Sequence, residues 1–530
     1  MENDVIMDAR TTETEVESTV SRAEYDAVVA ENAELRKKLD FIMGQVRLLK
    51  HKTFGSSSER ATEELFGQIS FIFNEAEAWK AEEKAPVEST TVAEHTRKKR
   101  SNNLDSALPE NIKVEVVEHG IPEEDRVCDV CGTIMERIGK EVTRTIVLHP
   151  ATATIREDVY YTYACQRCKA QATETPIMKT EKVPAVIPGS FASPEAISHI
   201  MVQKFVMASP LYRQEQELNR SGIKLSRQTM SNWILRAADD WLTPVYNEMH
   251  RRLVQEKVLH ADETTLQVLK EPGKTSQSKS YMWLYRTGSH AVHPMVLYEY
   301  RPDRKAGNAA NFLNGFSGWL HADGYPGYHS LPEWIRVVGC WAHLRRKFDE
   351  AVKSLPKQDQ PNSAALQGQA YCSKLFSIER ELQALPPEER YTQRLERSKP
   401  VMDALLAWAS ANKAAPKSAL GKALHYLEEQ WPYLIRVLED GRLELSNNLA
   451  ERSIKPFVIG RKNFLFANTP HGAQGSAVIY SMIETAKANN LDPYRYLTWV
   501  LTNAPMLASS GDDWATTLLP AHAPDHCRST

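Results

Sequence analysis

The tripeptide His-Ala-Asp occurs twice, each time at the end of a short apolar run. The first copy closes residues 258–262 and ends at Asp262, and the second closes residues 319–323 and ends at Asp323. Short apolar runs that stop at a polar residue or a turn are typical of buried β-strands. Aspartates at the ends of neighbouring strands can lie side by side, and paired carboxylates bind divalent cations. The sequence therefore predicts that Asp262 and Asp323 share a metal site.

A third carboxylate, Glu451, lies in a segment that is rich in asparagine and basic residues, 446–455. A helix that begins near residue 446 or 447 places Glu451 and Lys455 on one face, because residues four apart are neighbours on a helix. Glu451 could instead face solvent and pair with Lys455. We favour a metal-ligand role because this helix follows two strand-end aspartates. Asp349, on a helix expected at 341–352, is the alternative third ligand.

Three such carboxylates could hold two Mg²⁺ or Mn²⁺ ions about 4 Å apart, which activate water or a 3′-hydroxyl and stabilise the leaving oxygen of a phosphodiester. His343 could approach this site, but a packed or capping histidine is an equal alternative, and Cys340 is expected in the core. Basic residues close to the carboxylates in sequence are candidate contacts to DNA phosphates: Lys455, Arg461, Lys462, Arg345 and Arg346.

Four cysteines form two Cys-x-x-Cys pairs, Cys128 with Cys131 and Cys165 with Cys168. This is the ligand spacing of a structural zinc site. The 33 residues between the pairs exceed the usual zinc-finger gap, but a zinc ribbon with an extended hairpin accommodates them. A redox disulfide and free cysteines are the alternatives. Two pairs in a chain without a secretion signal favour Zn²⁺, and residues 111–188 are predicted to form the zinc ribbon.

The elements that must position the carboxylates follow one order from residue 256 onward. Three strands are expected first, then a helix, a strand, another strand and a helix; the ranges are 258–264, 281–285, 295–300, 306–316, 318–323, 336–340 and 341–352. This is the order of a ribonuclease-H-like fold, in which the first and fourth strands are neighbours. Glu263 should point to the strand face opposite Asp262. The core is assigned to 251–354 and 441–490, with a helical insertion at 355–440 and a C-terminal element at 491–530.

Residues 189–250 are interpreted as a helix-turn-helix DNA-binding region. Ser193-Pro194 and Ser209-Pro210 each look like an N-cap followed by proline at the first helical position. A third helix should begin at Ser226 and bury four apolar residues at helical spacing, Met230, Trp233, Ile234 and Ala237. Its outward face would present Arg227, Gln228, Ser231 and Asn232 to the major groove. An ordinary helical connector is the alternative.

The N-terminal third carries self-association signals. Residues 1–20 are predicted to be disordered. Residues 21–53 show nearly four heptads with Asn32 at an a position, a device that fixes parallel dimers, and Glu31 can pair with Arg36 of a partner chain. We predict a dimeric coiled coil, with an amphipathic helix packed on its own domain as the alternative. Residues 54–110 are predicted to be a linker with one short helix.

Composition bounds the class of protein without identifying it. The 530 residues suffice for three or four domains of about 150 residues. A net charge of −3 gives no overall basic character, so DNA binding would depend on local patches. No apolar run approaches the roughly 18 residues of a membrane span, and no signal peptide begins the chain. The expected fold class is multidomain α/β: a ribonuclease-H-like core with a helical insertion, a coiled coil, a zinc ribbon and a helix-turn-helix.

Taken together, these motifs resemble those of bacterial transposases of the insertion sequence 66 family, which belong to the DDE type. The resemblance covers nearly the whole chain and is most specific at 447–456 and 461–463. It also includes the two Cys-x-x-Cys pairs and the segments 54–59, 210–214, 260–264, 323–325, 340–348, 492–497 and 518–520.

The resemblance implies DNA cleavage at the ends of an insertion sequence and strand transfer into target DNA, with Asp262, Asp323 and Glu451 as the catalytic triad. Many DDE enzymes place a basic residue two helical turns after the glutamate. That position is Val458 here, which leaves Lys455 and Arg461 as candidates. The implied partners are double-stranded DNA, a second copy of the chain and accessory proteins of the same element, in the bacterial cytoplasm at the nucleoid. The alternatives are a nuclease without strand transfer and a non-catalytic DNA-binding regulator.

Overall fold

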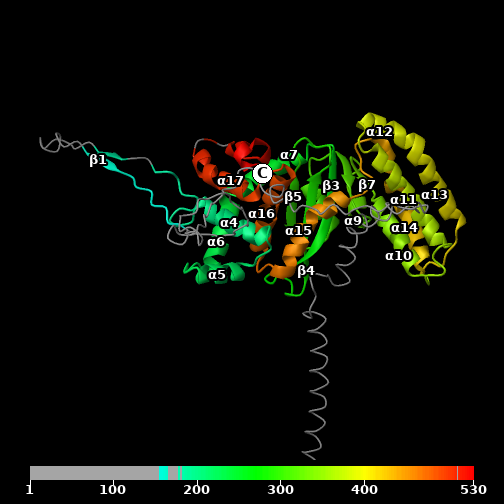
Figure 1. Ribbon diagram of the computed structural model, residues 1–530, viewed down its shortest axis with the longest axis horizontal. Coiled ribbons are helices and arrows are strands. Elements are labelled where there is room, and N and C mark those ends of the chain that lie inside the picture. The colour runs from blue at the N-terminus through cyan, green and yellow to red at the C-terminus, as the bar shows by residue number, and fades with distance from the viewer. Residues whose placement is uncertain (1–153, 165–176, 180–181, 510, 512, 530) are drawn as a thin grey trace, which may run out of the picture. The chain divides into compact units, whose positions relative to one another are not determined.

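The computed structural model describes residues 154–164, 177–179, 182–509, 511 and 513–529 (Figure 1). The predicted disordered tail, coiled coil and linker lie outside the described residues, as do Cys128, Cys131, Cys165 and Cys168 of the predicted zinc site. From the zinc-ribbon region, the structure describes an antiparallel pair of short strands, β1 (Thr162–Ala164) and β2 (Ile177–Lys179).

A five-stranded mixed sheet forms the centre of the described chain (green in Figure 1). Its spatial order is β5-β4-β3-β6-β7, and its strands are β3 (Val258–Gln267), β4 (Lys279–Thr287), β5 (Val296–Arg301), β6 (Gly318–His321) and β7 (Ile335–Val338). The first three strands pair antiparallel, whereas β3–β6 and β6–β7 pair parallel. The prediction that the strands of the two His-Ala-Asp motifs are neighbours is therefore confirmed.

Both faces of the sheet are covered, because four consecutive residues of β4, Met282 to Tyr285, are all buried. The edge strand β5 is also protected. The backbone N–H groups of Val296 and Tyr298 donate to the hydroxyls of Thr485 and Ser481 on α16 (Pro470–Ala488). These bonds satisfy backbone groups that an open sheet edge would expose.

Two helices bring functional candidates to the sheet. Helix α15 (Asn448–Phe464) packs across β3 and β4, and α10 (Trp341–Lys353) follows β7 directly. The predicted start of α15 is confirmed, because Asn447 is its N-cap residue. Two short helices connect the strands: α8 (Ala306–Phe312), which ends four residues before its predicted end at 316, and α9 (Pro326–His329).

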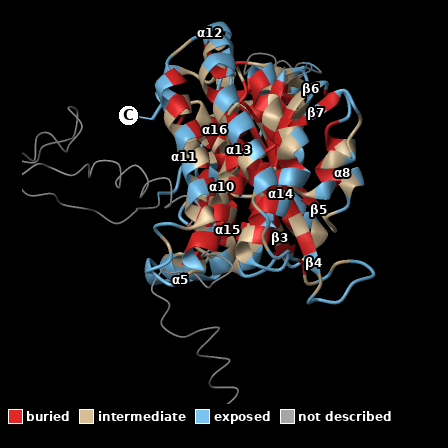
Figure 2. Cartoon of the chain, turned by 90° about the vertical axis from the view of Figure 1, so that its right-hand side faces the viewer, coloured by how far each residue is buried: buried red, intermediate tan, exposed pale blue. Residues whose placement is uncertain are grey.

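Between the sheet and α15 the chain makes a helical excursion, which consists of α11 (Ala364–Leu382), α12 (Pro387–Gln393), α13 (Lys399–Ala411) and α14 (Ala419–Leu434). A π-helical segment (Arg394–Ser398) precedes α13, and a 3₁₀ segment (Ile435–Glu439) follows α14. The excursion shares one apolar core with α10, to which Leu375, Met402 and Leu427 contribute. Figure 2 shows buried and exposed residues alternating along its helices, as is typical of amphipathic helices that pack on a core.

Hydrogen bonds from the side chain of Arg394 stabilise the end of this excursion. Its side chain is almost fully buried, and it donates to the carboxylate of Glu379 and to three backbone carbonyls, of Val437, Asp440 and Leu443. A buried guanidinium is tolerated when a carboxylate and several carbonyls satisfy it. Arg394 thereby fixes the path of the segment that enters α15.

The helical region before the sheet comprises α4 (Pro194–Phe205), α5 (Leu211–Arg220), α6 (Arg227–Ala237), a π-helical segment (Ala238–Leu242) and α7 (Thr243–Leu253). Ser193 and Ser226 cap α4 and α6 as predicted, and α6 buries the four predicted apolar residues. The prediction for Ser209 is wrong. Pro210 is the N-cap residue of α5 and makes no side-chain cap, because the helix starts one residue later than expected.

The C-terminal residues return to this helical region. Helix α17 (Pro493–Ala508) packs against α4 and is followed by α18 (Trp514–Thr517) and two 3₁₀ segments (Pro520–His522 and Asp525–Cys527). No helix among the described residues is both long and apolar enough to cross a membrane.

Candidate active site

Asp262 lies inside β3, and the prediction that it ends the strand is wrong. Strand β3 pairs with β6 only from Val258 to His260, whereas its pairing with β4 continues to Gln267. The apolar run ends at Ala261, but cross-strand hydrogen bonds to β4 carry the strand five residues beyond Asp262. Asp262 therefore has β4 on one side and lies just past the end of the parallel ladder with β6.

Asp323 stands at the corresponding place beside β6, two residues after that strand ends. Its Oδ1 accepts the backbone N–H of Tyr325 at 3.0 Å, and its Oδ2 is 4.0 Å from Nη2 of Arg304. Burial raises the pKa of Asp323, although its side chain keeps 29% exposure. Asp262 and Asp323 are thus brought together by the end of the short β3–β6 ladder, which explains the register of the two His-Ala-Asp motifs.

Glu451 occupies the first turn of α15. This is the positive end of the helix dipole, which favours a carboxylate. Its Oε1 is 3.8 Å from Nδ1 of His343, near the start of α10, and its side chain is 16% exposed. Glu451 therefore faces another element of the site and is not simply directed to solvent.

Electrostatics place these groups in one cluster. The pKa of Asp262 is raised well above its ordinary value by burial, then by the negative charges of Glu451, Glu263 and Asp323. Carboxylates that raise each other's pKa are costly to keep ionised together. A bound divalent cation would remove that cost, so the residues fit a metal with oxygen ligands.

Glu263, next to Asp262 in sequence, is engaged differently. Arg304 donates from Nε at 2.7 Å and also from Nη2, and the hydroxyl of Tyr328 donates to the other carboxylate oxygen. Burial and the charge of Asp323 raise the pKa of Glu263 to about 7 in spite of these donors. Since successive side chains of a strand point to opposite faces, these partners agree with the expectation that Glu263 faces away from Asp262.

His343 and Cys340 lie beside Glu451. One candidate ligand atom from each of the three residues lies within 4.8 Å of the other two. Burial, with the positive charges of Arg346 and Lys347, lowers the pKa of His343 to about 3, so its imidazole is neutral and can offer a nitrogen to a metal. Burial raises the pKa of Cys340 to about 12, which keeps it a thiol.

Asp349, the alternative third ligand, is held elsewhere. It accepts from Nε2 of Gln369 on α11 at 2.9 Å and pairs with Lys353 at 2.7 Å. Its partners therefore belong to α10 and the helical excursion, whereas Glu451 acts directly on Asp262.

The candidate phosphate contacts are divided between the site and its surroundings. Nη1 of Arg461 donates to the hydroxyls of Thr264 and Thr265, Lys455 is half-buried, and Lys462 is exposed. Val458, two turns after Glu451, is buried.

On α10, Arg345 donates to Ser373 of the excursion. Arg346 lies 3.8 Å from Glu350, and its charge also lowers the pKa of Asp323. Arg346 is thus the α10 cation that acts on the carboxylate cluster, whereas Arg345 is turned toward α11.

The predicted DNA-reading residues of α6 are on the surface. Arg227, Gln228 and Asn232 are exposed, and Gln228 donates to Asn232 at 3.0 Å. The guanidinium of Arg227 stands over the ring of Tyr212 at 5.6 Å. This surface is available to a nucleic acid in the described part of the chain.

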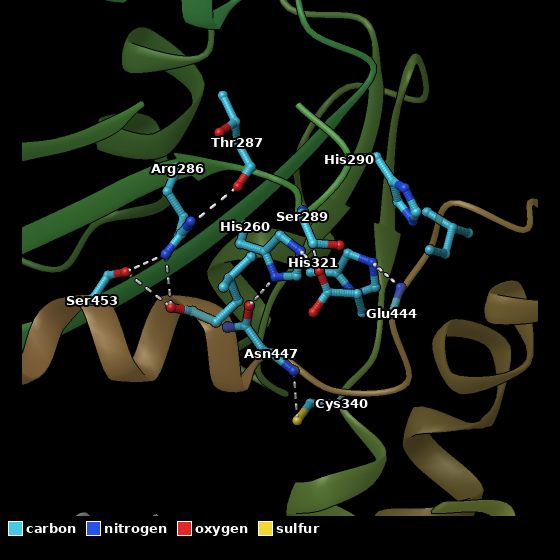
Figure 3. Close-up of polar contacts among 12 residues, drawn as sticks. His260, Arg286, Thr287, Ser289, His290, His321, Cys340, Glu444, Asn447 and Ser453 are labelled. Atoms are coloured by element: carbon cyan, nitrogen blue, oxygen red, sulfur yellow. Dashed lines mark hydrogen bonds and ion pairs between the residues drawn. The ribbon is translucent and has the colours of Figure 1, made fainter. Parts of the chain in front are cut away.

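Sequence reasoning missed a buried polar cluster that joins β3, β6 and the start of α15 (Figure 3). It contains His260, His321, Glu444 and Asn447. The repeated His-Ala-Asp motif was the available signal, because residues two apart on a strand share a face. It also missed Arg304, which lies in a loop and contacts both Glu263 and Asp323.

Comparison with known proteins gives three matches to family models. The model described as Transposase IS66 family matches residues 189–475, that described as IS66 C-terminal element matches 481–520, and that described as Transposase C of IS166 homeodomain matches 42–117. Two Sinorhizobium fredii proteins, named uncharacterized proteins y4jD and y4hP, are also similar. The first is 32% identical over 76% of this chain and 78% of its own length, and the second is 29% identical over 86% and 84%.

Proposed function

Because the chain belongs to the IS66 family of transposases, we propose that it binds the ends of an insertion sequence, cuts the DNA there and joins the cut ends to target DNA. The catalytic residues in this proposal are Asp262, Asp323 and Glu451, with Mg²⁺ or Mn²⁺ as the cofactor. The family match spans the whole five-stranded sheet and α15, so it includes all three carboxylates.

The observation that carries the proposal is the convergence of three carboxylates from distant parts of the sequence. Asp262 comes from β3, Asp323 follows β6, and Glu451 begins α15 after the helical excursion. Burial and then the negative charges of Glu451 and Asp323, among others, raise the pKa of Asp262. Arg304 pairs with Glu263 and lies 4.0 Å from Asp323, whereas the charges that act on Asp262 are negative.

The strand order supports a ribonuclease-H-like core, since three antiparallel strands are followed by two parallel ones on the β3 side. Two bound divalent ions would activate the attacking hydroxyl and stabilise the leaving oxygen. The chain's own part is to hold Asp262 and Asp323 at the end of one ladder, to direct Glu451 from a helix N-terminus, and to place the positive charge of Arg346 near Asp323.

DNA contacts are proposed at two places. Arg227, Gln228 and Asn232 on α6 would read the element ends, and basic residues near the carboxylates, Arg345, Arg346, Lys455, Arg461 and Lys462, would contact phosphates. We further propose that Cys128, Cys131, Cys165 and Cys168 hold a structural Zn²⁺. A coiled coil at 21–53 would pair two copies of the chain, and accessory proteins of the same element would assist at the bacterial nucleoid.

The test is Mg²⁺-dependent cleavage of a labelled DNA fragment that carries the flanking inverted repeats. We expect the wild type to cleave this DNA and Asp262→Asn to bind it without cleaving it. Asp403→Asn, which changes an exposed carboxylate on α13, is the control and should cleave normally. Equal cleavage by wild type and Asp262→Asn would overturn the triad. Asp349→Asn separates the two candidates for the third ligand, since only loss of the true ligand abolishes cleavage.

A second assay with pre-cut ends separates a transposase from a nuclease. Joining of the ends to target DNA is expected from wild type and not from Glu451→Gln. Cleavage without joining, even with the element's other proteins added, would favour a nuclease. Specific end binding without cleavage under the same conditions would favour a regulator.

A further inference from the structure

The three carboxylates sit on separate elements, so their spacing depends on what fixes those elements to one another. We propose that Asn447 and His260 are positioning residues that hold the Glu451 helix against the Asp262 strand at the distance that metal binding requires. This inference rests on the proposed function, because it assumes that Asp262 and Glu451 share divalent cations.

Asn447 does not use its side chain to cap its own helix. Asparagine at an N-cap usually accepts a backbone N–H from the first turn, but Asn447 makes no such bond. Its Nδ2 donates instead to the carbonyl of Ala261 at 2.8 Å. Its Oδ1 lies 3.0 Å from Nδ1 of His260 (Figure 3). Both bonds reach β3 within two residues of Asp262. The ordinary cap bond is thus replaced by a link between elements.

The main chain of Asn447 completes the connection to Glu451. Its carbonyl accepts the backbone N–H of Glu451 at 3.2 Å, and its own N–H donates to Sγ of Cys340 at 3.2 Å. Asn447 is 1% exposed. One buried residue therefore touches the neighbour of Asp262 through its side chain, the start of α10 through its N–H and Glu451 through its carbonyl.

The orientation of the amide fixes the tautomer of His260. Because Nδ2 donates to Ala261, Oδ1 must face His260, and Nδ1 of His260 must carry the proton. Nε2 of the same ring is 3.7 Å from Oε1 of Glu444. That distance is beyond a hydrogen bond, so among the described residues the hydrogen bond that orients the ring is the one from Nδ1 to Asn447.

His321 holds the face of the His260 ring. The two rings stack with centroids 4.3 Å apart and planes 12° apart, and both residues are fully buried. Nε2 of His321 accepts the backbone N–H of Glu444 at 3.2 Å. The paired histidines of β3 and β6 thus hold the segment that leads to Asn447, and each lies two residues before its aspartate.

Arg286 fastens the next part of the helix from β4, opposite His260 in the sheet register. Its Nη1 donates to Oγ of Ser453 at 2.5 Å and to the carbonyl of Leu449 at 3.4 Å. These contacts lie on either side of Glu451 in sequence. They support the backbone of the helix around Glu451. Arg461 links the far end of the helix to Thr264 and Thr265 of β3, so Asn447 and His260 make the link at the end of the helix that carries Glu451.

The test measures Mn²⁺ binding to the full-length protein by electron paramagnetic resonance, with cleavage kinetics alongside. Asn447→Ala and His260→Ala should each weaken Mn²⁺ binding by about 10–100-fold, as loss of a partner that orients metal ligands does. The double variant should bind Mn²⁺ no more weakly than the weaker-binding single variant, because both changes remove the same link. The kcat of cleavage should fall in parallel, while the Kd for element-end DNA stays unchanged.

Asn489→Ala is the matched control. Asn489 also ends in a part-buried amide, whose Nδ2 donates to the carbonyls of Pro294 and Thr485, on the α16 side of β5. This change should lower the thermal midpoint as Asn447→Ala does but leave Mn²⁺ affinity and kcat unchanged.

Three outcomes would overturn the inference. If Asn447→Ala binds Mn²⁺ as tightly as the wild type while Glu451→Gln loses binding, the positioning role is wrong and the proposed function still stands. An equal loss of affinity in Asn489→Ala would show that general destabilisation is responsible. If the wild type and Glu451→Gln bind Mn²⁺ equally, or neither binds it, the proposed function is rejected, and the positioning role with it.

Discussion

Glu263 and Asp262 are adjacent on β3, but the charged groups around their carboxylates differ. The carboxylate of Glu263 accepts hydrogen bonds from the guanidinium of Arg304 and from the hydroxyl of Tyr328. The pKa of Asp262, one residue earlier, is raised first by burial and then by the negative charges of Glu451, Glu263 and Asp323. The first arrangement stabilises a fold, and the second is costly unless a cation occupies it. The difference supports the proposal that the Asp262 face binds the metal.

The largest expected difference between the two faces is in catalysis. Asp262→Asn should reduce cleavage of element-end DNA by about 100–1000-fold, because it removes a carboxylate that stabilises developing charge through a metal. Glu263→Gln should reduce it by about 10-fold or less, since in this proposal Glu263 acts on Asp262 and Asp323 through its charge and through Arg304, and not as a metal ligand. Single-turnover cleavage rates at saturating Mg²⁺ measure both. A reversed order would transfer the ligand role to Glu263.

For the free energy of unfolding, Glu263→Gln should have the larger effect and Asp262→Asn the smaller. Glu263→Gln should lower the free energy of unfolding by about 2 kcal/mol, because an amide has one acceptor oxygen and leaves either Arg304 or Tyr328 without its partner. Asp262→Asn should leave stability unchanged or raise it in the absence of metal, because one of several like charges is gone. Urea unfolding in EDTA, followed by circular dichroism, gives both values. A destabilised Asp262→Asn would show that this carboxylate has a structural partner.

The pH dependence of the metal-free protein should follow the raised carboxyl pKa values. The pKa of Glu263 is about 7 in the folded protein and 4.5 ordinarily, so the folded state binds more protons than the unfolded state between these values. Stability contributed by this group is therefore lost as pH rises from about 4.5 to 7. The raised pKa of Asp262 acts in the same direction.

Thermal midpoints measured from pH 5 to 8 in EDTA test this expectation. The decline with rising pH should be shallower in Glu263→Gln and in Asp262→Asn than in wild type. Added Mg²⁺ should raise the wild-type midpoint more at pH 8 than at pH 5, because protons compete with the metal. A midpoint raised equally at both values would place the metal away from these carboxylates.

The smallest expected effect concerns the choice of metal. His343 lies 3.8 Å from Glu451 with a neutral imidazole, and a nitrogen ligand favours Mn²⁺ over Mg²⁺. His343→Ala should weaken Mn²⁺ binding by about 10-fold and change Mg²⁺ binding less. Isothermal titration with each ion gives the ratio. An unchanged ratio would make His343 a packing residue beside the site.

Local sequence patterns predicted much of the fold around these two faces. The Asn447 start of α15 and the buried stripe of α6 were predicted, because capping and helical period are local properties. The pairing of β3 with β6 was predicted from the order of elements in a ribonuclease-H-like fold. Boundaries that depend on partners were predicted less well. Asp262 was expected at a strand end, but pairing with β4 extends the strand to Gln267.

The sequence by itself determined which residue types could do metal chemistry and that two of them follow the same His-Ala-Asp motif. It did not determine how Asp262 and Glu263 differ, because Arg304 and Tyr328 lie 41 and 65 residues away from Glu263. Nor did it predict that Asn447 would bond to His260 across 187 residues. Such partners meet only when strands and helices pack, and burial then sets the strength of each charge. Tertiary structure alone decided that Arg304 and Tyr328 contact Glu263 and that other carboxylates surround Asp262.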